Sequence, residues 1–242
     1  MLLPFTNVMA MESSFEYFVK EDLHRYLAGK GEMDERIPEC PDVEGLWMHV
    51  AESYGADGIR EFNEYPEVSL GWMMFVGMAV TEFWDKDWER YSAIEDLYLH
   101  LRDVRGFDCM DEHILEDILC LDKEAAAKTS ELVADCAGRV YSLLRHSQLE
   151  PGTAEAFRGY ISCLHQLYLA GMCVQLHRLG YDKSPGMTKK PFVHPPSGLL
   201  NPRRLTSAAP IRGISHLRCG PFGTFLVLLS VSVTDSEFLT QE

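Results

Sequence analysis

Apolar residues recur at three- and four-residue intervals along most of the first 180 positions, which predicts a chain of helices. The first such pattern covers 15–27 and ends at the Gly29–Gly31 pair. A second begins near Pro41 and is interrupted by Gly55 and Gly58 before Phe62. Further patterns cover 88–105, 108–119, 122–145 and 153–179. The last two are joined by the short turn "EPGT", so we expect antiparallel neighbours in an all-α bundle of about six or seven helices.

The middle of the chain does not show this alternation of apolar and polar positions. The 14 residues of the segment 68–81 carry no charge, and Glu67 and Glu82 bound it. A membrane-spanning helix needs about 20 apolar residues, so this segment is too short to span a bilayer. A helix that is apolar on all sides is normally buried on all sides, and Gly71 and Gly77 would suit a close helix crossing. The segment is therefore predicted to be the central helix of the bundle, with a ligand-lining wall as the alternative.

The patterning also predicts boundaries. Residues 12–182 form the helical domain, and residues 1–11, which lack the basic start of a signal peptide, form a leader. Residues 183–242 lose the helical spacing and become rich in Pro and Gly. This composition predicts a disordered C-terminal extension, or translation beyond the natural end of the domain.

Composition and charge limit the function classes. Hydrophobic residues make up 46% of the chain and charged residues 24%, which is typical of a globular protein with a real core. The net charge is −15, and the acidic excess lies before the Pro/Gly-rich extension. An acidic body repels phosphate backbones, so nucleic-acid binding is not expected. Seven scattered cysteines without a C-x-x-C pattern indicate a reducing compartment, and we predict a cytoplasmic protein.

Some acids and histidines are spaced so that they could share a metal site inside the bundle. A carboxylate-bridged site needs two Glu-x-x-His pairs, and the chain offers one. Pairs of this kind also arise by chance on acidic helices, so surface pairing is the main interpretation and no cofactor is predicted. The alternative is a divalent metal held by carboxylates and imidazoles. Its candidate ligands are Glu21, His24, His49, Glu52 and His113.

The most distinctive local feature is "TEFWDKDWERY". Trp84 and Trp88 lie four apart, so a regular helix would place both on one face, with Asp85 beside them. An aromatic platform rimmed by acids would suit a cationic ligand or a basic peptide. The alternative is that both rings pack under a neighbouring helix.

Several stretches, among them "FEYFVKEDLHRYL", "CPDVEGLWMHVAE", "YPEVSLGWMMFVGMAV" and "CLHQLYLAGMCVQLHRLGY", resemble a small uncharacterised bacterial all-helical family, a domain of unknown function. The resemblance covers about residues 12–182 and implies no activity or cofactor. We expect a non-enzymatic protein-interaction or regulatory domain with a protein partner or self-association. The alternatives are a metal-binding protein or metal-dependent enzyme, and an acidic decoy for a basic protein.

Overall fold

The computed structural model describes residues 5–34, 43 and 45–181 of the 242-residue chain. Within these residues the chain forms seven α-helices and no β-strand, which confirms the all-α class. The α-helices are α1 (Phe5–Lys30), α3 (Trp47–Glu64), α4 (Pro66–Tyr91), α5 (Leu97–Arg105), α6 (Met110–Glu112), α7 (Lys123–Arg145) and α8 (Ala154–Arg178). A 3-10 helix, η1 (Phe107–Cys109), and a π-helix, η2 (His113–Ile118), flank α6. The C-terminal extension predicted for 183–242 lies outside the described residues.

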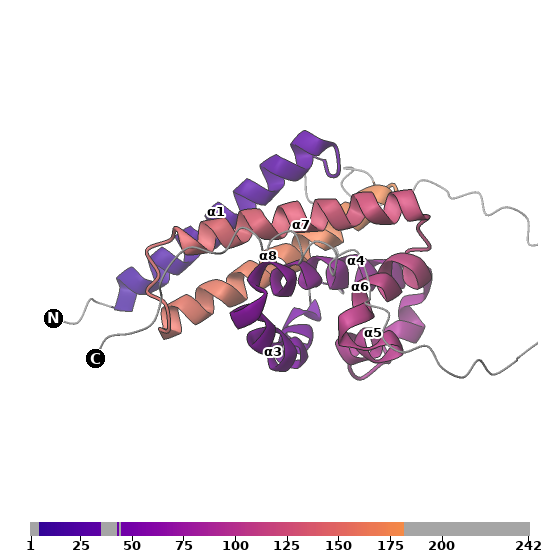
Figure 1. Cartoon of the computed structure of the whole chain (residues 1–242), viewed down its shortest axis with the longest axis horizontal. Helices are drawn as coiled ribbons and strands as arrows, with labels where there is room; N and C mark the ends of the chain where they lie inside the picture. The colour runs from indigo at the N-terminus through magenta and orange to yellow at the C-terminus, as the bar shows by residue number, and fades with distance from the viewer. Residues whose placement is uncertain (1–4, 35–42, 44, 182–242) are drawn as a thin grey trace, which may run out of the picture.

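Helix α4 is the hub of the bundle. Every residue from Ser69 to Phe83 is buried, so the uncharged segment is enclosed on all sides, as its composition predicts. Figure 1 shows α1, α7 and α8 running roughly along the long axis of the molecule, while α3 and α5 lie to one side of them. The prediction of a central buried helix is confirmed.

The closest helix crossing is between α4 and α8. A Cβ at Gly77 would overlap the carbonyl oxygen of Tyr168, and a Cβ at Gly171 would overlap the carbonyl oxygen of Met74. Each glycine therefore lets the backbone of the other helix approach, which offsets the helix propensity that glycine lacks. The two helices run parallel, because Gly77 lies against Tyr168 and Glu82 bonds to Gln175 further along both.

Helix α1 covers α7 and α8. Arg139 of α7 donates two hydrogen bonds to Asp22, at 2.9 and 3.0 Å, and Gln166 of α8 donates to Glu16 at 2.9 Å. Arg178, at the end of α8, reaches Thr129 near the start of α7. The long helices α7 and α8 are therefore antiparallel, as their short connection predicts.

Two boundaries differ from the sequence patterns. Helix α1 begins at Phe5, so residues that were assigned to the leader are helical. The predicted helix 88–105 is wrong in extent, because α4 continues to Tyr91 and α5 starts afresh at Leu97. The cause is the Asp96 side chain, which accepts a hydrogen bond from the Leu99 amide at 2.9 Å and so caps a new helix.

Candidate functional site

The tryptophan segment at the end of α4 is packed rather than open. Trp84 and Trp88 are both partly buried against the core. The Trp84 ring lies 5.3 Å from the Tyr181 ring, and the Tyr181 hydroxyl donates to Asp85 at 2.7 Å. The backbone leaves the helical region at Asp87 (φ −165°, ψ 76°), between the two indoles. The regular four-residue register is therefore broken, and these contacts fit the packing interpretation better than an aromatic platform.

The five candidate metal ligands are distributed over three elements. Glu21 and His24 belong to α1, His49 and Glu52 are exposed on α3, and His113 is buried in η2. Across the described ranges, no three or more His, Cys, Asp or Glu side chains gather in a way that could hold a metal ion. The structure therefore does not bring the candidates together, and a divalent metal stays a prediction.

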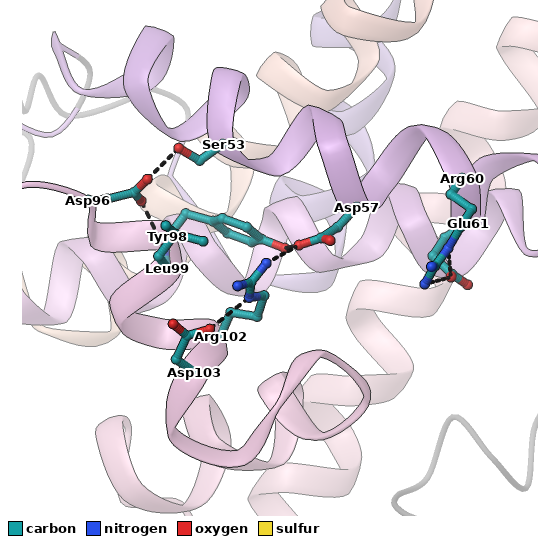
Figure 2. A network of polar contacts seen from close by, with 9 residues as sticks. All are labelled: Ser53, Asp57, Arg60, Glu61, Asp96, Tyr98, Leu99, Arg102 and Asp103. Carbon is teal, nitrogen blue, oxygen red and sulfur yellow. Dashed lines mark hydrogen bonds and ion pairs between the residues drawn. The ribbon is translucent and has the colours of Figure 1, made fainter.

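A polar network that the sequence analysis missed joins α3 to α5 (Figure 2). Asp57 of α3 accepts hydrogen bonds from the Tyr98 hydroxyl and from Nη1 of Arg102, both at 2.8 Å. One turn earlier, the Ser53 hydroxyl donates to Asp96, the residue that caps α5. The signal in the sequence was the four-residue spacing on both helices, which places Ser53 above Asp57 and Tyr98 above Arg102.

Tyr98 anchors this network in the core. Tyr98 is fully buried, and burial together with the bond to Asp57 raises the pKa of its hydroxyl far above the usual range. The Arg102 guanidinium has a raised pKa too, because it donates to Asp57 and to Asp103. The tyrosine and the arginine thus keep their protons, and Asp57 keeps both partners. The network fixes how α3 lies on the bundle, and therefore which face of α3 reaches solvent.

A second cluster ties η2 to α5. Arg105 donates to Glu116 and to Asp117, each at 2.9 Å, and the other oxygen of Asp117 lies 2.8 Å from Nδ1 of His113. The bond with His113, followed by the charge of Arg105, lowers the pKa of the Asp117 carboxyl. An ionised Asp117 holds His113 in one orientation inside the π-helix. This explains the placement of His113 as a structural contact and separates it from the other metal candidates.

The outward face of α3 carries a feature of a different kind, which we name the α3 seam. It consists of Met48, Glu52, Gly55 and Ile59, at spacings of four, three and four residues. Met48 is 72% exposed and Ile59 is 45% exposed. A Cβ built on Gly55 would find no atom of the described residues within 4 Å, so these residues leave open space between the two large side chains. The buried face of the same helix is formed by Trp47, Val50, Tyr54 and Gly58.

No family model, no curated protein and no solved structure matches the chain. The resemblance to a bacterial helical family therefore stays a prediction. Among the described helices, none is long and apolar enough to cross a membrane. Cys120, Cys136 and Cys163 are free thiols, but Cys109 is disulfide-bonded, which does not support the reducing compartment inferred from the scattered cysteines. The cytoplasmic location stays a prediction.

Proposed function

We propose that this chain is a helical protein-interaction domain and that the α3 seam is its docking surface. The observation that carries the proposal is the pair Met48 and Ile59, two large apolar side chains exposed on one flank of a helix with open space at Gly55 between them. Methionine and aromatic residues are enriched at protein interfaces, and exposed apolar side chains that lie together favour a binding surface.

The network beneath α3 supports this choice. A docking surface binds more tightly when its backbone is already ordered, because less conformational entropy is lost on association. The bonds of Asp57 with Tyr98 and of Ser53 with Asp96 join α3 to α5. Tyr54, which is fully buried, donates from its hydroxyl to the Ser69 carbonyl of α4. The seam is thus a rigid ridge with adaptable side chains.

Another exposed apolar pair lies on α1, where Tyr17 and Phe18 contact each other edge to face. The described side chains of α1 begin at Ser14, three residues before this pair. The α3 seam is the better-defined surface, since every side chain from Gly45 to the end of α3 is described.

Site-specific photo-crosslinking tests the proposal. The full chain carries p-benzoylphenylalanine at Met48, and a matched control carries it at Glu131, an exposed position on α7. We expect a discrete adduct in native extract from position 48 and none from 131. Adding Ile59→Asp to the Met48 variant should remove the adduct while far-UV circular dichroism stays unchanged.

The mass of the adduct then separates a second copy of the chain from a different protein. Without any discrete adduct from position 48, or with the same pattern from both positions, the seam is not a docking surface and the proposal is wrong.

A further inference from the structure

We propose, resting on the function proposed above, that the partner presents to the α3 seam an amphipathic helix that carries basic side chains. Two independent properties of the seam, its shape and its charge, indicate this kind of partner.

The shape of the seam fits a helix. Positions 48, 52, 55 and 59 repeat at four-, three- and four-residue intervals, which is the spacing along which two helices pack side by side. The open space at Gly55 lies between Met48 and Ile59 and can take a large side chain of the partner as a knob. Inside this molecule, Gly77 of α4 likewise allows the backbone of α8 to approach closely. At Gly55 no helix among the described residues takes that place, and we assign it to a partner chain.

The charge of the seam favours a basic helix. Glu52 lies between Met48 and Ile59, is exposed, and forms no ion pair with a described residue. Helix α3 contains one arginine, Arg60, which pairs with Glu61 at 3.2 Å. Its last turn holds exposed Glu64 and no basic residue, so no side chain of that turn offsets the negative end of the helix dipole.

The charge also disfavours a second copy of the same chain. Each copy has a net charge of −15, and long-range repulsion would oppose their encounter. The seam itself offers no basic side chain to meet the Glu52 of a second copy. A cationic partner, in contrast, would be attracted over a distance of about 10 Å at moderate salt.

Two synthetic probes test the chemistry directly. Each is a fluorescent helical peptide of about 15 residues with a leucine stripe, and the residues that flank the stripe are lysine in one and glutamate in the other. Anisotropy titration with the full chain should show binding of the lysine peptide, with the glutamate peptide at least about tenfold weaker. Binding of the lysine peptide should weaken as salt rises.

Matched variants locate the binding. Gly55→Leu fills the open space and should weaken binding of the lysine peptide by about tenfold. Ala56→Leu places the same side chain on the next exposed position, outside the seam, and should leave binding unchanged. Glu52→Lys should lower affinity for the lysine peptide and raise it for the glutamate peptide.

Three results would overturn the inference. One is equal binding of both peptides, or binding of neither. If the crosslink from position 48 is nevertheless present, the seam is still an interaction surface, but its partner is of a different kind. Another is an equal effect of Gly55→Leu and Ala56→Leu. The third is slow oxidation of Met48 by hydrogen peroxide in the free full chain, measured by mass spectrometry, since that would mean that the chain covers its own seam.

Discussion

The carboxyl group of Asp111 offers the sharpest quantitative test of the fold. Asp111 lies in α6, is 2% exposed, and its Oδ2 atom has no hydrogen-bond partner in the part of the chain that the structure describes. Burial raises the pKa of this carboxyl from its ordinary value of 3.8 to about 6, and the nearby charge of Glu112 acts in the same direction. The amide hydrogen bonds that it accepts only partly offset the effect.

The sign of the stability effect follows from the direction of the shift. The folded chain binds the Asp111 proton more tightly than the unfolded chain does, so the ionised form destabilises the fold. This destabilisation is absent below pH 3.8, grows as the pH rises, and is complete above about pH 6. A pKa raised from 3.8 to about 6 corresponds to about 3 kcal/mol at pH 7.

The perturbation is Asp111→Asn, which keeps the shape and removes the ionisation. The amide does not titrate, so any change in fit that it introduces contributes equally at every pH. We therefore expect the stability of the variant, relative to that of the unaltered chain, to be higher at pH 7 than at pH 4. The difference in free energy of unfolding should reach up to about 3 kcal/mol. Urea unfolding followed by circular dichroism at both pH values measures it.

The control is Asp108→Asn, which removes one carboxylate from an exposed position three residues earlier. It should show a much smaller pH-dependent difference, because its charge stays in water in both states. If the Asp111→Asn difference is the same at pH 4 and pH 7, the carboxyl is not buried without a partner as described, and the reasoning is refuted.

Two further predictions concern packing and thiol chemistry. Gly77→Ala should destabilise the fold by roughly 1–3 kcal/mol, because the new methyl group overlaps the Tyr168 carbonyl. Gly55→Ala should stabilise it by up to about 1 kcal/mol, because its methyl group meets open space and alanine favours helix. Thermal unfolding measures both variants, and stability changes of the same sign would contradict the prediction. Cys120 is exposed, while burial raises the pKa of the Cys136 and Cys163 thiols to about 12 in each case. In a titration with Ellman's reagent, Cys120→Ser should therefore remove one fast-reacting thiol, and Cys136→Ser should leave the fast phase unchanged.

Local patterns predicted what depends on one helix at a time. The buried face of α7 contains most of its apolar stripe, whereas Phe157, an apolar residue near the start of α8, is 49% exposed. Asp122 and Thr153 cap these helices through Ala125 and Ala156, as residues of their type do. The burial of α4 followed from an uncharged run that was too short for a membrane.

Contacts between distant segments were beyond the sequence. The bond between Asp57 and Tyr98 joins residues 41 positions apart, and nothing in either helix marks the other as its partner. The kink at Asp87 lies between Trp84 and Trp88, and the four-residue spacing in the sequence gives no sign of it. The candidate site could be inferred only after the exposed and buried flanks of α3 were distinguished.

Glycine on an apolar helix face connects the core with the proposed surface. On α4, Gly77 lowers helix propensity, and the structure shows the compensation, since α8 occupies the space that a side chain would fill. On α3, Gly55 lowers helix propensity in the same way, between Met48 and Ile59, yet no atom occupies the space beside it. A helix in a partner protein would supply at Gly55 the contact that α8 supplies at Gly77, and it would cover the two exposed apolar side chains at the same time. Because Glu52 projects from the middle of this surface and pairs with no cation among the described residues, the helix that covers it should be basic.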